Sequence, residues 1–429
     1  MNILLIHQYY LEKHDSGGSR WNEMVKVWAE NGHRITVLAG MTHYSTGKKH
    51  HLFKGKYVYE EEEHKNVRVI RSHVSEKYNT GFAGRLRGYI SFVFSSVYAG
   101  IFRAKEKYDL IVVSSPPLFV GIAGYFLSRL KRIPYVFEVR DLWPESAIDT
   151  GIVKNKLVIK LAFAAEKFIY KKAKLINVLT PAFKESIIAK KNIPAEKIIY
   201  IPNAADFNLS EKLLHSFQAQ SFRKELGWED KFVVCYVGAH GVANHLIQVL
   251  QTASILKDSN VLFVLIGDGM QKNMLKEKMY NMQLKNVQFI DPVPKEEIFK
   301  YILAADVGTS VLMKNDTFKT VYSNKTFDYL SCKKPVLMAI EGVSKKLIEE
   351  AQAGLYVEPE NPEHFAKQVK AYLNNPQLLS QHGENGYAFV HKYFDREKLA
   401  AEYITELEKF IKKKTTVASV QKQKIKNIA

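Results

Sequence analysis

Short apolar runs alternate with amphipathic helical segments along this sequence. The first run, 2–7, is followed by a glycine-bearing loop, a helical segment and a second run at 35–39. Parallel strands cannot be joined by a tight turn, so this order is typical of a βαβ unit in a parallel sheet. The same order predicts strands at 67–72, 110–114, 135–139, 175–179 and 198–201, with helices near 84–107, 118–131 and 155–173. The first half is therefore expected to be an α/β domain.

The pattern starts again in the second half. Strands are expected at 232–237, 261–266, 287–289, 307–312 and 335–338, with helices near 243–257, 270–282, 295–303, 324–332 and 344–352. We therefore predict two Rossmann-like, doubly wound domains, 1–205 and 206–390, then a helix over 391–414 that returns to the first domain and a basic, disordered tail over 415–429. Two such domains facing each other bring the carboxyl ends of both sheets to a central cleft, where ligands of these folds bind.

The composition excludes several classes of protein. Cys235 and Cys332 are the only cysteines among 429 residues, which rules out a disulfide scaffold and a cysteine-based zinc site and indicates a reducing, cytoplasmic compartment. No basic segment precedes the first apolar run, so no secretory signal is expected. The uncharged stretch 88–102 is shorter than the roughly 20 residues that a membrane-spanning helix needs.

The net charge of +18 is unevenly distributed. Residues 1–205 contain 32 Lys and Arg against 18 Asp and Glu, and 409–429 contain 7 Lys and no acidic residue, which leaves 206–408 at −3. A basic first half is suited to an anionic surface or a polyanion, although solubility alone also accounts for it.

Glycines occupy two loops between an expected strand and an expected helix. At Gly17 and Gly18 the bare backbone could approach a phosphate, although such a pair more often forms only a tight turn. It matches neither the dinucleotide fingerprint nor the P-loop. Gly267, Asp268 and Gly269 follow a strand of the second half, either as a strand-to-helix turn or as a loop that faces the cleft.

Charged residues stand at the ends of two expected elements. Arg140 and Asp141 follow the strand at 135–139, where charges are costly unless they are paired with each other or used in a site. Lys325 lies in the first turn of the helix at 324–332, and Asp328 lies on the same face. This lysine could hold an anion and the carboxylate could accept from the hydroxyls of a ribose, whereas the alternative is an ordinary surface lysine.

No metal or cofactor is expected. The chain has no D-x-D sequence, and no His, Cys and carboxylate residues have the spacing of a metal site. A bound diphosphate would therefore be neutralised by Lys, Arg and helix termini.

Taken together, these segments resemble the retaining family-4 glycosyltransferases of GT-B fold. The matching motifs occur in order along almost the whole chain, at 17–18, 32–37, 180–181, 201–206, 266–269 and 324–329. The segments 115–117 and 139–145 resemble a subgroup from O-antigen, capsule and exopolysaccharide synthesis, some members of which transfer N-acetylfucosamine-type sugars.

The resemblance implies transfer of a hexose-type sugar from a nucleotide-sugar donor, expected to be a UDP-sugar, to a lipid-linked saccharide with retention of configuration. It implies that Arg140 and Asp141 are catalytic. The donor-binding residues that it implies are Gly17, Gly18, Gly238, His240, Asn324, Lys325, Thr326 and Asp328.

The chain departs from the family pattern at two places. Family members commonly carry two glutamates eight positions apart, and here Thr320 and Asp328 stand at those positions. Many members also grip the diphosphate with an Arg and a Lys after the first strand of the second domain, and 237–244 contains neither. Lys325 is the candidate replacement for that pair.

Two other functions fit parts of the sequence. A nucleotide-sugar epimerase shares the two-domain architecture, and a non-enzymatic polyanion-binding protein would account for the charge, although nucleic acid is not an expected partner. The apolar segment 86–102, flanked by Arg and Lys, is either a buried helix or one whose side reaches a bilayer interface. We expect a peripheral protein on the cytoplasmic face of the inner membrane, whose basic first half meets an anionic membrane surface.

Overall fold

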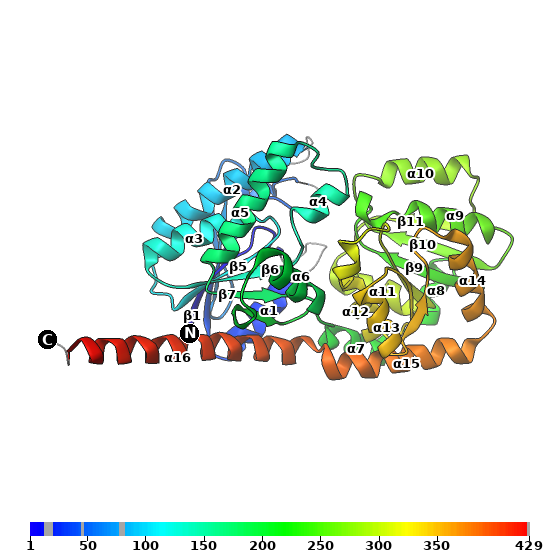
Figure 1. Ribbon diagram of the computed structural model, residues 1–429. Coiled ribbons are helices and arrows are strands. Elements are labelled where there is room, and N and C mark those ends of the chain that lie inside the picture. Colours follow the sequence, from blue (N-terminus) through cyan, green and yellow to red (C-terminus); the bar gives the residue numbers. More distant parts are fainter. Residues whose placement is uncertain (13–19, 44–46, 77–81, 427–429) are drawn as a thin grey trace.

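The computed structural model describes residues 1–12, 20–43, 47–76 and 82–426, with side chains up to residue 413. It contains two α/β domains side by side, each built on a sheet with helices on both faces (Figure 1). This confirms the predicted fold class. Gly17 and Gly18 lie outside the described residues.

The first sheet has eight strands in the order β3-β4-β2-β1-β5-β6-β7-β8. All its neighbouring pairs are parallel except β3 with β4. Its strands are β1 (Asn2–Ile6), β2 (Arg34–Gly40), β3 (Val58–His64), β4 (Val67–Ser72), β5 (Leu110–Ser114), β6 (Tyr135–Val139), β7 (Leu175–Val178) and β8 (Ile198–Tyr200).

Two groups of helices cover this sheet. Helices α2, α3, α5 and α6 bury one set of apolar side chains, and α1 and α16 bury another set on the opposite face. The helices are α1 (Arg20–Glu30), α2 (Phe82–Phe102), α3 (Val120–Lys131), α4 (Glu145–Asp149), α5 (Lys156–Lys172) and α6 (Pro181–Lys191), with α16 (Arg396–Lys426) arriving from the far end of the sequence.

The second sheet has six parallel strands in the order β11-β10-β9-β12-β13-β14. They are β9 (Phe232–Val237), β10 (Val261–Ile266), β11 (Val287–Ile290), β12 (Val307–Val311), β13 (Val336–Ala339) and β14 (Gly354–Tyr356). The helices around it are α7 (Phe207–Ser216), α8 (Ala219–Glu225), α9 (Ile247–Ile255), α10 (Lys272–Asn281), α11 (Lys295–Ala304), α12 (Asn324–Ser331), α13 (Val343–Glu350), α14 (Pro362–Leu373) and α15 (Pro376–Tyr393).

Strand β3 is absent from the sequence prediction. It contains Glu60, Glu61 and two further glutamates, so it has no apolar alternation. As an edge strand it pairs with β4, where Glu60 meets Arg68 at 2.5 Å and Glu61 meets Arg71 at 2.8 Å. Cross-strand ion pairs therefore take the place of an apolar face.

The chain crosses between the domains twice, and the two crossings are hydrogen-bonded to each other. The backbone N–H of Ala205 donates to the carbonyl of Phe394 at 2.8 Å, and that of Arg396 donates to the carbonyl of Ala205 at 3.1 Å. After the second crossing, α16 runs along the first domain (Figure 1). The indole of Trp28 in α1 donates to the carbonyl of Ala400 at 2.9 Å.

Helix α16 continues to Lys426, whereas the sequence predicted a disordered tail from residue 415. The reason is local: no Gly or Pro occurs between Arg396 and Lys426, so nothing in the covalent chain interrupts the helix. No helix in the described part of the chain is both long and apolar enough to cross a membrane.

Candidate active site between the two sheets

A cavity of about 430 Å³ lies between the two domains. Its lining comes from loops that follow strands of both sheets: His7 after β1, Arg140 after β6, Gly238 after β9 and Gly267 after β10. These are the carboxyl ends of parallel strands, where doubly wound folds place their ligands.

On the first domain, His7 and Arg140 face each other across this edge. The Nη1 atom of Arg140 lies 3.5 Å from Nε2 of His7, and both residues line the cavity. Burial, and next the charge of Arg140, hold the pKa of His7 well below its usual range. The imidazole is therefore neutral at physiological pH, beside a permanent cation.

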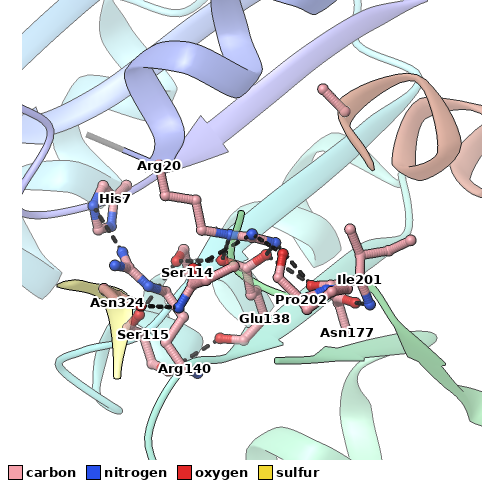
Figure 2. A network of polar contacts seen from close by, with 12 residues as sticks. His7, Arg20, Ser114, Ser115, Glu138, Arg140, Asn177, Ile201, Pro202 and Asn324 are labelled. Carbon is pink, nitrogen blue, oxygen red and sulfur yellow. Dashed lines mark hydrogen bonds and ion pairs between the residues drawn. The ribbon is translucent and has the colours of Figure 1, made fainter. Parts of the chain in front are cut away.

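A buried polar network lies beside this pair (Figure 2). The carboxylate of Glu138 in β6 accepts from Arg20 at the start of α1, from Ser114 at 3.2 Å and from Asn177 at 3.0 Å. The hydroxyl of Ser115 donates to the carbonyl of Glu138 and accepts from the backbone N–H of Arg140. The backbone at Arg140 is thereby fixed to the sheet.

The same network reaches the second domain through the first crossing. Arg20 donates to the carbonyls of Ile201 and Pro202, at 3.0 and 2.5 Å. The next residue, Asn203, donates from its side-chain amide to the side-chain oxygen of Asn324, the first residue of α12. A continuous chain of hydrogen bonds therefore links the first sheet to the helix that carries Lys325 and Asp328.

On the second domain, two glycine loops pack directly on each other. A Cβ on Gly267, where φ is +143°, would lie 2.0 Å from the carbonyl oxygen of Gly238, which only a glycine avoids. A Cβ on Gly238 would in turn lie 3.1 Å from the Cε of Lys325. Because Gly238 and Gly267 have no side chains, the two loops and Lys325 can pack against one another at the cavity wall.

Lys325 and Asp328 are half-buried and line the cavity, on the side of α12 that does not pack in the domain core. The ammonium of Lys325 lies 4.8 Å from the ring centroid of Tyr236, and burial lowers its pKa to about 8. Burial raises the pKa of Asp328 to about 6, against the opposing effect of Lys295. The ammonium of Lys325 and the carboxylate of Asp328 are thus both desolvated and one helical turn apart. These two groups do not form an ion pair with each other.

Further charges surround Asp328 from four other parts of the chain. Lys295 at the start of α11 pairs with Glu23 of α1 and with Asp206 at 2.7 Å, and Arg396 pairs with Glu23 at 2.7 Å. Lys295 and Arg396 line the cavity. No local sequence pattern marks these residues as part of a site, because only tertiary contact brings them together.

Three of the site residues predicted from the sequence do not line the cavity. The carboxylate of Asp141 accepts from the hydroxyl of Ser146, in the following helix α4, at 2.8 Å. The hydroxyl of Thr326 is buried against that of Ser310 at 2.9 Å. The side chain of His240 is wholly buried between the rings of Tyr236 and Phe289.

These three placements have a common physical cause. Each residue type could serve a site, but here each side chain contacts a partner within its own domain instead of lining the cavity. His240 is an example. Its backbone N–H donates to the carbonyl of Asp268 at 2.8 Å, and burial lowers the pKa of its imidazole ring to about 4. Its role in the structure is to join the 238–242 and 267–271 loops.

Several residues at the cavity were missed by the sequence analysis. They are His7, Arg20, Asn203, Lys295 and Arg396. His7 had a usable signal, because it ends the first strand as Arg140 ends a later one. Among the described residues no three His, Cys, Asp or Glu side chains lie close enough together to hold a metal ion.

Comparisons with known proteins agree with this architecture. Residues 17–204 match the Glycosyl transferase 4-like domain, and residues 218–389 match the Glycosyl transferases group 1 family. The chain is 22% identical to WcaI of Escherichia coli K12, named as a colanic acid biosynthesis glycosyl transferase, over 95% of this chain and 100% of that one.

Two solved structures share the fold over nearly their full length. Anabaena HepE in complex with UDP superposes with a TM-score of 0.68 at 17% identity, covering 95% of this chain and 100% of that chain. WaaG, a glycosyltransferase involved in lipopolysaccharide biosynthesis, superposes with a TM-score of 0.68 at 15% identity, covering 94% and 98%. The fold and the two domain matches define a GT-B glycosyltransferase. The chain belongs to glycosyltransferase family 4.

Proposed function

We propose that this enzyme transfers a hexose-type sugar from a UDP-sugar to a lipid-linked saccharide during synthesis of a cell-surface polysaccharide, such as an O-antigen, capsule or exopolysaccharide. The single observation that carries the proposal is the cavity itself, with Lys325 and Asp328 on the second domain opposite His7 and Arg140 on the first. HepE was solved with UDP and with UDP-glucose, and WcaI is named for colanic acid biosynthesis, which supports this donor and this class of product.

In this proposal the second domain holds the nucleotide. Asp328 accepts from the ribose hydroxyls, and Lys325 at the first turn of α12 neutralises the diphosphate together with the helix N-terminus. No metal ion takes part, because the chain lacks the D-x-D that would hold a metal diphosphate. Gly238 and Asn324 shape the wall beside these groups.

The transfer step retains the anomeric configuration. The bond between the anomeric carbon and the diphosphate oxygen breaks, and the electron pair leaves with the nucleoside diphosphate. The acceptor oxygen bonds to the same face of that carbon, and its proton passes to an oxygen of the departing phosphate. Lys325 stabilises the charge that develops on the phosphate, while Arg140 and the neutral His7 orient hydroxyls of the sugar or acceptor.

The lipid-linked acceptor places the enzyme at the cytoplasmic face of the inner membrane as a peripheral protein. The segments 115–117 and 139–145 favour the subgroup that includes N-acetylfucosamine-type transferases. Gly17 and Gly18 are proposed to approach the donor phosphates from the first domain.

The proposal is tested by incubating the purified protein with a panel of UDP-sugars and other nucleotide sugars, with and without a lipid-linked saccharide. We expect nucleoside diphosphate release that depends on the acceptor, and a product whose anomeric configuration, measured by NMR, equals that of the donor. Product formation without any acceptor would instead indicate the epimerase, and no release with any donor would contradict the transferase.

A further inference from the structure

Exposed apolar side chains gather on three neighbouring helices of the first domain. Of the 18 large hydrophobic side chains exposed in the described part of the chain, ten lie on α2, α3 and α5. Phe94 is 70% exposed, Leu157 65% and Leu161 62%. We call these ten the α2–α3–α5 face: Ile90, Phe94, Tyr98, Ile101, Phe102, Phe126, Leu130, Leu157, Leu161 and Phe168.

On each helix these residues form a stripe rather than a scatter. In α2 they recur at intervals of three or four residues from Ile90 to Phe102, and in α5 Leu157 is followed four residues later by Leu161. Such spacing places them on one side of a helix. The opposite side of α2, with Phe92 and Ala99, is buried in the domain core. The helix is thus buried on one side and apolar on the other.

Helices α2, α3 and α5 lie next to one another on the same side of the first sheet (Figure 1), and their contacts are close. A Cβ on Gly100 of α2 would lie 2.6 Å from Leu127 of α3, and a Cβ on Gly121 of α3 would lie 2.5 Å from Ile169 of α5. Tyr125 and Phe168 also pack edge to face, with ring centroids 4.9 Å apart, between α3 and α5.

The charges on the three helices are almost all positive. Neither α2 nor α3 contains an acidic residue. The acidic residue of α5, Glu166, is buried and paired with Lys191 at 2.6 Å. The exposed basic residues on or next to the three helices are Arg87, Arg103, Lys105, Lys107, Arg129, Arg132, Lys154, Lys156, Lys160, Lys167, Lys171 and Lys172. The segment that follows α2 also contains the exposed acidic residues Glu106 and Asp109, and Arg103 pairs with Glu60 at 3.7 Å.

Helix α3 of this face begins near the cavity. Strand β5 ends at Ser114, Pro116 lines the cavity, and α3 begins at Val120. The amino-terminal end of α3 therefore lies at the same edge of the sheet as the site. If a membrane lay against this face, a lipid-linked acceptor would reach the cavity by extending past this edge of the sheet.

We propose that the α2–α3–α5 face docks on an anionic lipid bilayer, with its aromatic and aliphatic side chains in the interface and its lysines and arginines on the headgroups. This rests on the proposed function, which places the acceptor on a lipid. An apolar stripe with basic flanks matches an anionic bilayer in both polarity and charge. An acidic protein partner would complement the charge of the lysines and arginines. It would not account for the ten exposed apolar side chains between them, which a bilayer interface does.

The test measures flotation of the purified full chain with phosphatidylcholine vesicles that contain or lack phosphatidylglycerol. One variant carries Phe94→Gln and Leu161→Gln, and another carries Lys156→Glu and Lys160→Glu. The matched controls are exposed residues of the second domain, Ile255→Gln with Tyr280→Gln, and Lys257→Glu with Lys276→Glu. Melting temperatures show that each variant is folded.

We expect the wild-type chain to float with the anionic vesicles at low salt and to be released as the salt concentration rises. The variant with Lys156→Glu and Lys160→Glu should partition at least about 25-fold less, since each of the two lysines near the surface contributes about fivefold. The variant with Phe94→Gln and Leu161→Gln should also partition less than the wild type, because two apolar side chains no longer enter the interface. The control variants should float like the wild type.

The proposal is wrong if neither face variant floats less than the wild type. It is also wrong if the wild-type chain does not bind anionic vesicles at low salt. If that chain instead forms a dimer that the Gln variants dissociate, the occupant is a second copy and the bilayer is excluded. Affinity for UDP in solution distinguishes the two proposals: it should be equal in all variants, and its absence would count against the proposed function rather than the face.

Discussion

Arg20, the first residue of α1, and Glu138, in the centre of the first sheet, form an ion pair with Nη2 and Oε2 3.0 Å apart and both side chains almost wholly buried. The same guanidinium donates to two carbonyls of the crossing between the domains. One side chain therefore satisfies the buried carboxylate and ties the sheet to the crossing.

Replacement of Arg20 by Met should strongly destabilise the protein. The carboxylate of Glu138 would stay buried without its cation, which costs about 3–5 kcal/mol and lowers the melting temperature by about 10 °C. Adding Glu138→Gln to Arg20→Met should restore part of the loss, because the buried charge is then gone. Calorimetric melting of the single and double variants checks this, and a double variant that melts no higher than the single one contradicts it.

Lys325→Ala should lower affinity for UDP by about 10- to 100-fold, the value of a hydrogen bond or ion pair to a charged group. Affinity for uridine should change little, because uridine has no diphosphate. Lys346→Ala, an exposed lysine of the same domain, is the control. Titration calorimetry measures all three, and equal losses for UDP and uridine would show that Lys325 is not at the phosphates.

The affinity of the wild-type chain for UDP should fall above about pH 8. Burial lowers the pKa of Lys325 to about 8 in the empty cavity, so at higher pH the ligand must bind a neutral amine or pay for its protonation. Below that pH the lysine is already charged, and its contribution is constant. Binding isotherms from pH 7 to 9.5 should show this loss in the wild type and not in Lys325→Ala.

Asp328→Asn should weaken nucleotide binding while raising the melting temperature of the empty protein at pH 7 by about 2–4 °C. Burial raises the pKa of Asp328 from 3.8 to about 6, so the folded state disfavours the charged form. The wild type therefore gains stability as the pH falls through about 6, and the variant has no such gain. The two melting curves should converge near pH 4; a constant difference from pH 4 to 7 would mean that Asp328 does not titrate as argued.

His7→Phe and Arg140→Ala should each lower the turnover number by at least about tenfold and leave the affinity for UDP unchanged, since both side chains lie on the first domain. Asp141→Asn should have a smaller effect, because its carboxylate accepts from Ser146 of α4 and does not line the cavity. Steady-state rates and UDP titrations of the three variants test this. A fall in UDP affinity for His7→Phe would place His7 on the nucleotide instead.

The fold was predictable because the chemistry that builds it is local. Runs such as 2–7 and 261–266 are buried on both faces and cannot be mistaken for solvent-exposed strands. Strand β14 has only three residues, and β3 has its glutamates paired by arginines of β4, so neither leaves an apolar signal.

The candidate site was predictable only to the level of loops. Position after a strand indicated that Arg140 approaches the cleft, and position in the first turn of a helix indicated the same for Lys325. Neither position could show which way the side chain turns. Thr326 follows Lys325 directly, and the helix turns its hydroxyl into the core. Lys295 and Arg396 reach the cavity from elements that are far apart in the sequence, so no local pattern marks them.

The return of α16 means that the first domain is not a contiguous stretch of sequence. Trp28 and Ala400 are 372 positions apart, yet they are joined by a hydrogen bond in the same core as Trp21 and Tyr403. A ribosome making this chain completes the whole second domain before the residues that close the first one emerge. Until then the indole rings of α1 have no cover on that side. A nascent or truncated chain that stops before Leu399 should therefore be captured by chaperones through its first domain.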